Sequence, residues 1–373
     1  MYLEKIGVNN FRNYALAGIE PGPNLNVIYG ENAQGKTNLL EAIYFIFSAI
    51  SHRTRKDKEL IRWNSDFFKI QGEVHLGDGP RSLQIDYHRL KGKTIKINYH
   101  QMTVDQYFSH FPVVIFYPQD IFLLTGGPAV RRRFLNTEIT RLYPHYYHQL
   151  IKYYRILAQR NNILKSGVFY HDDSPDTWGE FLADCGSRII RERIKYLGRM
   201  EKYASRFQGY FTGGKEDIKL EYKSKVNING LTGDGGNKGI HEIKNNFLEA
   251  LERRKEEELK RGYTLVGPHV DDMSVLLNNR EIKKASSQGQ QRTTIISLKM
   301  AQASMLKEEK KEEPLLLMDD CFSELDRRRS YQVLEMIEEN KIQCFITSYE
   351  RLDLPGKMET LFFRIDKGNI SCG

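Results

Sequence analysis

A glycine-rich loop is the first part of the sequence whose residue types and spacing could do chemistry. Residues 30–37 read Gly-Glu-Asn-Ala-Gln-Gly-Lys-Thr and fit the pattern G-x-x-x-x-G-K-[ST]. In that pattern the backbone N–H groups and the start of the next helix hold phosphate, so we expect Lys36 to reach the β- and γ-phosphates of ATP and the Thr37 hydroxyl to bind Mg²⁺. The predicted nucleotide contacts are Gly30, Glu31, Asn32, Ala33, Gln34, Gly35, Lys36, Thr37 and Asn38.

Two acidic residues end an apolar run later in the chain. Residues 315–318 read Leu-Leu-Leu-Met, and Asp319 and Asp320 follow them. Carboxylates at a strand end are costly unless a cation or a bound water uses them. We predict that Asp319 holds Mg²⁺, directly or through water, and that Asp320 polarises the attacking water as a catalytic residue. The alternative is a pair of helix-capping acids, and the phosphate-binding loop in the same chain favours the metal site.

A third candidate segment precedes that acidic run. Residues 286–292 read Ser-Ser-Gln-Gly-Gln-Gln-Arg, and Ser287 with Gln290 has the spacing of a helix capping box. The segment is also similar to the L-S-G-G-Q-Q-R signature of ABC ATPases. That resemblance implies that Ser287, Gly289 and Gln290 contact a γ-phosphate bound by a second copy of the chain. Two chains would then close two ATP sites, and ATP binding would stabilise the dimer.

The elements expected to position these residues form an α/β domain. Residues 25–29 are predicted to be a strand before the glycine-rich loop, and 39–50 a helix after it. Period-two alternation from 68 to 99 predicts an antiparallel meander. The apolar runs 113–117, 315–318 and 343–347 indicate buried strands, and 361–365 a final strand.

The middle of the chain changes to helical spacing. Apolar residues recur every three or four positions from Leu135 to Leu157, and further helices are predicted at about 177–211 and 241–261, with a glycine-rich loop at 230–239. We therefore expect an ATPase head built from 1–125 and 263–373, with a helical arm inserted at 126–262.

A stripe of cations follows one side of the second arm helix. Its members are spaced three or four residues apart, as neighbours on one helix face are. DNA phosphates would relieve their mutual repulsion, whereas the alternative is an ordinary solvated face. Backbone contacts rather than base-specific contacts are expected. The stripe consists of Arg188, Arg191, Lys195, Arg199, Lys202 and Arg206.

Composition limits the class of protein. The chain has 373 residues, a net charge of +8 and a pI near 9.0, which suits nucleic acid, an acidic membrane surface or plain solubility. Its four cysteines lack the spacing of a zinc or redox motif. Acidic and basic residues interrupt the N-terminus where a secretory signal would be apolar, and 39–50 is too short to span a bilayer. We expect a cytoplasmic protein without a membrane partner.

Six motifs together resemble the RecF family of SMC/ABC-type ATPases. They run in family order across nearly the whole chain: F-R-N-Y at 11–14, G-E-N-A-Q-G-K-T-N at 30–38, S-H-R-T at 51–54, R-R-R-F-L at 131–135, S-Q-G-Q-Q-R at 287–292 and D-D-C-F-S-E-L-D at 319–326. The resemblance implies an ATPase head with a short helical arm and an antiparallel β subdomain. It also implies ATP-dependent dimerisation on DNA, slow ATP hydrolysis, and gap repair in which RecR and RecO help RecA to load, with support of replication and SOS induction.

The same resemblance assigns further residues. Gln119 is expected to contact Mg²⁺, and Arg12, Arg53 and Lys56 are candidate phosphate contacts. Thr347 or Ser348 is expected to sense the γ-phosphate where ABC proteins use a histidine. Residues 323–326 resemble the D-loop of that superfamily. The chain departs from the family at Val270, within 267–271, where arginine is expected, so the role of that stretch stays open.

Three other functions fit parts of the sequence. A transporter-type ABC subunit would share the ATP motifs, although an inserted basic arm argues against it. A single-chain P-loop kinase or GTPase would need no signature helix, and the chain lacks an N-K-x-D motif for guanine. A clamp that binds ATP without hydrolysing it would not need Asp320.

Overall fold

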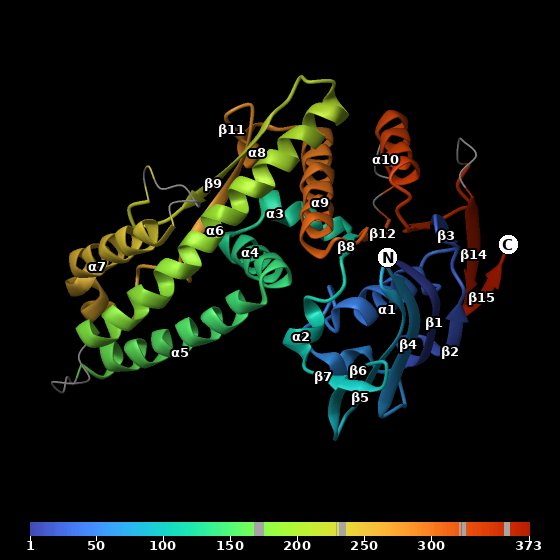
Figure 1. Cartoon of the computed structure of the whole chain (residues 1–373), viewed down its shortest axis with the longest axis horizontal. Helices are drawn as coiled ribbons and strands as arrows, with labels where there is room; N and C mark the ends of the chain where they lie inside the picture. Colours follow the sequence, from blue (N-terminus) through green and yellow to red (C-terminus); the bar gives the residue numbers. More distant parts are fainter. Residues whose placement is uncertain (168–174, 229, 231–235, 321, 323–325, 354–358) are drawn as a thin grey trace. The chain divides into compact units, whose positions relative to one another are not determined.

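The chain folds as two compact units in a computed structural model (Figure 1). The structure describes residues 1–373 except 168–174, 229, 231–235, 321, 323–325 and 354–358. One unit comprises 1–120 with 295–373, and the other comprises 121–294. Cys321 and most of the predicted D-loop, 323–325, lie outside the described residues.

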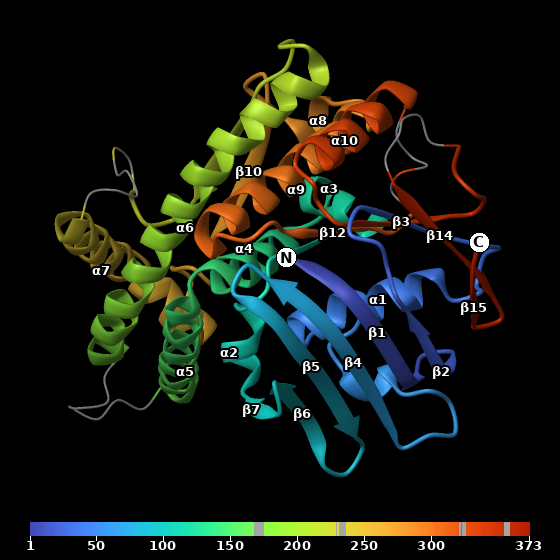
Figure 2. The ribbon, with the colours of Figure 1, turned by 45° about the vertical axis from the view of Figure 1, so that its right-hand side comes forward.

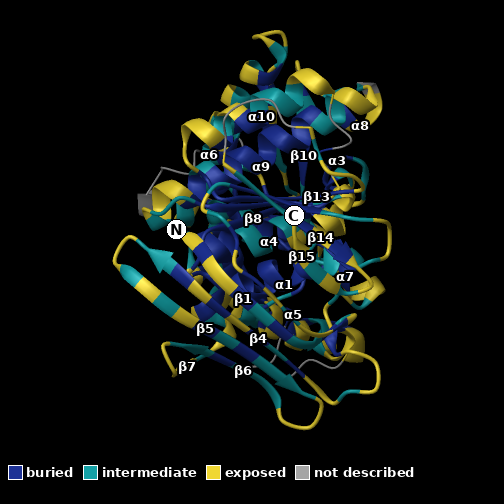
Figure 3. Cartoon of the chain, turned by 90° about the vertical axis from the view of Figure 1, so that its right-hand side faces the viewer, coloured by how far each residue is buried: buried dark blue, intermediate teal, exposed yellow. Residues whose placement is uncertain are grey.

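A parallel sheet forms the centre of the first unit. Its strand order is β15-β14-β3-β13-β12-β8. The five strands from β14 to β8 are parallel, and β15 pairs antiparallel with β14. The bounds are β3 Leu25–Tyr29, β8 Val113–Phe116, β12 Leu315–Met318, β13 Cys344–Ser348, β14 Thr360–Asp366 and β15 Asn369–Cys372. The apolar runs predicted as buried strands are therefore confirmed, and they appear dark blue in Figure 3.

An antiparallel sheet forms the other layer of this unit, in the order β2-β1-β4-β5-β6-β7. The predicted meander is confirmed as β4 to β6, and the N-terminal hairpin extends it. Buried and exposed residues alternate along its strands (Figure 3) because only one face covers the core. The bounds are β1 Tyr2–Phe11, β2 Tyr14–Ile19, β4 Phe67–Leu76, β5 Gly79–His88, β6 Gly92–Ile97 and β7 His100–Met102.

Helix α1 (Lys36–Ser48) packs against strands of both sheets (Figure 2). It starts three residues earlier than the apolar pattern from Leu39 predicted, because its first turn is the polar end of the phosphate-binding loop. Ala49, in the left-handed region at φ 54°, ends it. The unit also contains η1 Asp57–Leu60, α2 Val104–Phe108 and α10 Arg327–Glu339, and η2 Pro118–Ile121 lies in it except for its last residue.

The second unit is mostly helical. Its bounds are α3 Phe122–Thr125, α4 Pro128–Leu142, α5 Pro144–Ser166, α6 Pro175–Thr212, α7 Gly236–Arg261 and α8 Ile282–Ala285. The helices predicted at 177–211 and 241–261 correspond to α6 and α7. The continuous apolar spacing from 135 to 157 suggested a single helix, but the structure has two helices there, α4 and α5. Pro144 lacks the N–H that would continue α4, so it opens α5 at its first position instead.

The contact-based units differ from the predicted domain bounds. β10 (Asp272–Leu277) pairs antiparallel with β9 (Ile218–Lys223), and β11 (Arg280–Glu281) pairs with β10. These hydrogen bonds tie the segment after residue 262 to the second unit, whereas the sequence placed it in the head. β9 lies between the helix predicted at 177–211 and the loop predicted at 230–239, in a stretch of the helical arm for which the sequence predicted no strand. Helix α9 (Gln288–Lys310) contains residues of both units.

The stretch 267–271 joins several elements of the second unit. Gly267 has φ 123°, and a Cβ there would lie 2.4 Å from the Tyr153 hydroxyl oxygen. The Arg193 guanidinium is fully buried and donates to the Pro268 carbonyl oxygen at 2.7 Å. The buried Asp271 carboxylate accepts hydrogen bonds from Tyr222 at 2.8 Å and Ser224 at 2.9 Å. In this structure the stretch is therefore a packing element between α5, α6 and β9.

Candidate nucleotide and magnesium site

The phosphate-binding loop lies between β3 and α1, as the sequence predicts. Gly30 and Gly35 have φ values of 150° and 126°, and Ala33 has 63°. A Cβ on Gly30 would lie 2.4 Å from the Ile365 carbonyl oxygen, so only glycine fits there. No hydrogen bond from a side chain caps the start of α1. Its first N–H groups therefore point to where an anion would bind.

The Lys36 side chain lies back across this loop. Its Nζ donates to the Gly30 carbonyl oxygen at 2.7 Å and to the Glu31 carbonyl oxygen at 2.8 Å. Lys36 is buried. The loop's own backbone thus holds the ammonium beside the loop, where phosphate oxygens could replace those two acceptors. This position fits the role predicted for Lys36.

Polar side chains from the N-terminal hairpin brace the loop. The Tyr14 hydroxyl donates to the Gly35 carbonyl oxygen at 2.9 Å, and the Asn13 amide donates to the Gln34 carbonyl oxygen at 2.9 Å. The Asn38 amide donates back to Asn13 Oδ1 at 2.8 Å. The sequence indicated 11–14 only as a motif, and the function of these side chains needed the fold to show it.

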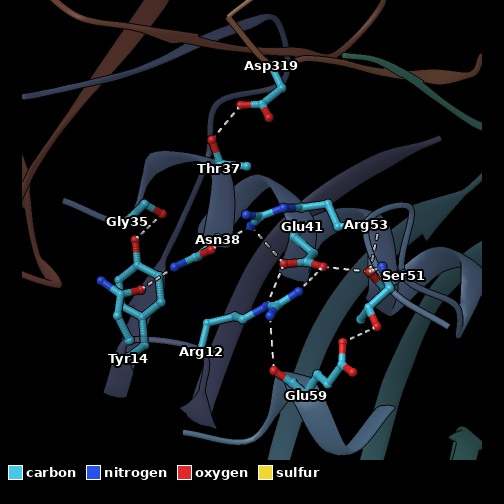
Figure 4. Close-up of polar contacts among 12 residues, drawn as sticks. Arg12, Tyr14, Gly35, Thr37, Asn38, Glu41, Ser51, Arg53, Glu59 and Asp319 are labelled. Atoms are coloured by element: carbon cyan, nitrogen blue, oxygen red, sulfur yellow. Dashed lines mark hydrogen bonds and ion pairs between the residues drawn. The ribbon is translucent and has the colours of Figure 1, made fainter. Parts of the chain in front are cut away.

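Thr37 and Asp319 meet although they are far apart in sequence. The Thr37 hydroxyl donates to Asp319 Oδ1 at 2.9 Å (Figure 4). Asp319 is buried at the carboxyl end of β12, and its burial raises the pKa of the carboxyl group while the Thr37 hydrogen bond opposes this shift. A hydroxyl and a carboxylate are hard oxygen donors of the kind that Mg²⁺ takes. The residues present therefore fit the metal.

The protein by itself offers Mg²⁺ few ligands here. Among the described residues, no group of three or more His, Cys, Asp or Glu side chains could hold a metal ion. A cation between Thr37 and Asp319 would complete its coordination with water and phosphate oxygens, as is usual for Mg²⁺ in nucleotide sites.

Thr347, at the end of β13, contacts both acids. Its Oγ1 accepts the Asp320 N–H at 2.8 Å, and it lies 3.0 Å from Asp319 Oδ1 and 3.2 Å from Asp320 Oδ1. One hydroxyl has one proton, so it donates to one carboxylate at a time. Asp320 is exposed and has φ 50°, which turns it out of the strand. The Ser348 hydroxyl donates instead to the Glu350 carbonyl oxygen, which leaves Thr347 as the better placed of the two predicted sensors.

Arg12 is engaged with the protein rather than free at the loop. Its guanidinium donates to Glu41 Oε2 at 2.8 Å and Oε1 at 2.9 Å, and to the Glu59 carbonyl oxygen at 3.0 Å (Figure 4). Burial alone would raise the pKa of the Glu41 carboxyl group, but hydrogen bonds from Arg12 and Ser51 lower it below its usual value. Glu41 was missed as a site residue, although a charge inside an apolar helix is a visible signal.

Of two other predicted contacts, Arg53 shares the Glu41 cluster and Gln119 lies apart from it. Arg53, on the same cluster, donates to Asn38 Oδ1 at 2.9 Å and lies 3.4 Å from Glu41 Oε2. Gln119 is exposed in η2, just after β8, at the same strand edge as Asp319. Its neighbour Asp120 forms a buried ion pair with Lys299 at 2.7 Å.

The predicted signature starts α9 as a capping box. Ser287 N–H donates to Gln290 Oε1 at 2.8 Å, and Gln290 N–H donates to Ser287 Oγ at 3.3 Å. The Gln290 amide also donates to Glu216 Oε1 at 2.8 Å. Ser287 and Gly289 are exposed, whereas Gln290 is half-buried by these contacts. The segment therefore caps the start of α9, and it leaves Ser287 and Gly289 exposed to solvent.

The basic stripe on α6 is less exposed than predicted. Arg188, Lys202 and Arg206 are exposed, but Arg191, Lys195 and Arg199 are half-buried because the helix packs on more than one side. Arg188 lies 3.5 Å from Asp184, and Arg199 donates to the Tyr143 hydroxyl. Arg193, which the helical spacing leaves out of the stripe, is fully buried on the same helix.

None of the helices in the described parts of the chain has the length and apolar character needed to cross a membrane.

Comparisons with known proteins agree on one family. Residues 2–362 match the RecF/RecN/SMC N terminal domain family. The "DNA replication and repair protein RecF" of Halalkalibacterium halodurans is 36% identical over 375 residues, which cover 99% of each chain.

Solved structures show the same relation. A recombination mediator protein RecF, solved as RecF-ATPrS in the RecFOR pathway, is 32% identical with a TM-score of 0.89, over 100% of this chain and 98% of that one. An Smc head domain from Pyrococcus furiosus, 13% identical with a TM-score of 0.56 over 100% and 96%, shares the fold. The chain thus has an ABC/SMC-type ATPase head fold with an inserted helical arm, and it belongs to the RecF family.

Proposed function

We propose that this chain is a slow ATPase that binds ATP with Mg²⁺ and dimerises on DNA with ATP between two copies. The contact between Thr37 and Asp319 carries the proposal, because it joins the phosphate-binding loop to the acidic strand end at 2.9 Å. The likeness to an RecF structure that contains a nucleotide supports it.

Each site residue has a part in this scheme. The loop 30–38 binds the phosphates, and Thr37 and Asp319 hold Mg²⁺ together with Gln119. Lys36 neutralises the β- and γ-phosphates, and Asp320 orients the attacking water. Thr347 is in contact with both acids, which suits a sensor of the γ-phosphate. Arg12 supports the loop through Glu41.

The second copy completes the site in this proposal. Ser287 and Gly289, with Gln290 behind them, meet the γ-phosphate bound by the partner chain. Their exposure supports this role. Dimerisation then depends on ATP, because the phosphates lie between two surfaces that otherwise lack a common ligand.

The biological role we propose is that of the family's named members, DNA replication and repair. The protein acts in recombinational gap repair in the cytoplasm and, with RecR and RecO, helps RecA to load, in support of replication and SOS induction. DNA is bound through its backbone, by the exposed cations of the α6 stripe among others.

Sedimentation tests the central step. Wild type and Lys36→Met are compared with and without ATP and Mg²⁺, in the presence of a labelled gapped duplex. ATP should convert only the wild type to a dimer that retains DNA. If the wild type binds ATP but stays monomeric, the proposed dimer is wrong and a single-chain P-loop enzyme is the better description.

A further inference from the structure

An exposed tryptophan stands on a turn at the end of the antiparallel sheet where β4 begins. The Ser65 N–H donates to the Arg62 carbonyl oxygen at 3.1 Å and closes the turn. Trp63 and Asn64 occupy its two central positions, and Asn64 has φ 62°. Trp63 is 87% exposed, so its ring contributes little of the stabilisation that a buried tryptophan normally gives.

Hydrogen bonds hold this turn on both sides. Arg62 N–H donates to the Asn10 carbonyl oxygen at 2.8 Å, which ties the turn to β1. On the other side, Arg89 N–H donates to the Asp66 carbonyl oxygen at 2.9 Å, and Arg89 Nε donates to the Ser65 carbonyl oxygen at 3.3 Å. A ligand that stacked on the ring would therefore meet a surface that is already ordered, at a small entropic cost.

The tryptophan lies at a basic end of this sheet. β4 and β5 pair with Phe67 opposite His88, so the loop 53–66 and the hairpin tip 89–93 share one end of the sheet (Figure 2). Together they contain eight basic and three acidic residues, a net charge of +5 where the whole chain has +8. The basic residues are Arg53, Arg55, Lys56, Lys58, Arg62, Arg89, Lys91 and Lys93.

Some of these cations are already used within the fold. Lys93, for example, pairs with Asp57 at 2.8 Å. Four others, Arg55, Lys58, Arg62 and Lys91, are exposed, and none of them has an ion pair within the described part of the chain. The surface thus offers positive charge that the protein itself does not neutralise.

We propose that this surface, residues 53–66 with 89–93, binds single-stranded nucleic acid, with an unpaired base stacked on Trp63 and phosphates beside the exposed cations. A net positive charge attracts a polyanion, and a flat aromatic ring is a stacking platform for bases. In a duplex the base faces are already stacked on each other, so a duplex could contact the cations but not the ring. The inference rests on the proposed DNA-binding function and assigns one part of it to the head unit.

Fluorescence can report on this site directly. The chain has two tryptophans, so Trp178→Phe leaves Trp63 as the single indole. In that otherwise complete chain, we expect oligothymidylate to quench the Trp63 emission saturably, and a blunt duplex of the same length to leave it nearly unchanged. Quenching that is absent with the single strand at saturating binding would overturn the stacking.

Affinity measurements give a second test. Because one stacked base is worth about 1–3 kcal/mol, Trp63→Ala should weaken oligothymidylate binding roughly 5- to 150-fold, while Trp63→Phe keeps most of it. Tyr99→Ala is the matched control. Tyr99 is 86% exposed in the turn at the far end of β6, outside the basic surface, and its replacement should change nothing.

The cations are tested separately. Arg62→Glu combined with Lys91→Glu should weaken binding of the single strand and flatten its dependence on salt, because fewer counterions are released. If Trp63→Ala binds as tightly as Tyr99→Ala while the wild type still dimerises on DNA with ATP, this inference fails alone. If the wild type binds neither single strand nor duplex, the proposed function fails with it.

Discussion

Single buried polar residues decide how the site is held. Glu41 is fully buried in α1, and the Arg12 guanidinium reaches both of its carboxylate oxygens. Breaking such a pair leaves an uncompensated buried charge, which is far more costly than losing a surface ion pair. Arg12 also donates to the Glu59 carbonyl oxygen, so one side chain connects β1, η1 and the helix after the phosphate-binding loop. A nucleotide contact by Arg12 would have to compete with these bonds.

Asp271 gives a prediction about pH. Its burial raises the pKa of the carboxyl group from 3.8 to about 6, although hydrogen bonds from Tyr222 and Ser224 oppose the shift. The folded state therefore holds this proton longer than the unfolded state, so the stability contributed by Asp271 falls as pH rises from about 4 to 6. The Asp271→Asn variant lacks the titrating carboxyl group, so it lacks this loss of stability with rising pH. The variant's free energy of unfolding, measured in urea at pH 4.5 and pH 7.5, should rise more steeply with pH than the wild type's.

His269 acts in the opposite direction and has to be considered in that measurement. Its burial lowers the pKa of the imidazole from 6.5 to about 4, so its contribution is lost as pH falls through this range. In the wild type the two effects partly cancel. An Asp271→Asn variant whose pH dependence equals that of the wild type would show that the carboxylate is ionised in the fold at pH 5.

At the scale of elements, glycine positions on α6 show how tightly the helices of the second unit pack. A Cβ on Gly186 would lie 2.5 Å from the Phe247 ring of α7 and 3.2 Å from Tyr153 of α5. A Cβ on Gly198, further along the same helix towards its C-terminus, would have no atom within 4 Å. The absence of a side chain at Gly186 is thus what allows three helices to approach each other.

Alanine substitutions at these two glycines should have opposite effects. Gly198→Ala should stabilise the protein by about 0.5–1 kcal/mol, because alanine favours a helix interior over glycine. Gly186→Ala gains the same propensity but must displace the Phe247 ring, so a net loss of about 1–3 kcal/mol is expected. Thermal melting of both variants beside the wild type measures the contrast. Equal shifts would mean that Phe247 moves aside without cost.

At the scale of the whole molecule, the proposed site is divided between copies of the chain. In the proposed dimer, one copy contributes the phosphate-binding loop and the acidic strand end, and the other contributes Ser287 and Gly289. Each half is built from local structure that forms without the other, since α1 follows its loop and α9 starts with its own capping box. A dimer therefore has two complete sites only when both copies are intact.

Mixing two inactive variants tests this division. Lys36→Met lacks the phosphate contact, and Ser287→Arg blocks the signature surface. Each variant alone should lose ATP hydrolysis. A mixed dimer unites the intact loop of one with the intact signature of the other, so the mixture should regain activity with, at most, one working site in each mixed dimer. A mixture as inactive as its components would contradict sites that are shared between chains.

Much of the site was determined by the sequence alone, because its signals are local. The phosphate-binding loop requires glycines and a lysine within eight positions, and the buried strands are continuous apolar runs. The capping box at Ser287 and Gln290 is likewise a relation between residues three apart. Such patterns reflect backbone conformation and short-range hydrogen bonds, which neighbours in sequence dictate.

Only the tertiary structure decided which distant groups meet. The order β3-β13-β12-β8 places Thr347 against Asp319 and Asp320, and it brings Asp319 to Thr37. It also half-buried Arg191, Lys195 and Arg199 of the predicted stripe, and it paired β9 with β10 across the chain. The physical reason is that burial and strand pairing depend on which faces the whole fold covers, and a residue's neighbours in sequence do not carry that information.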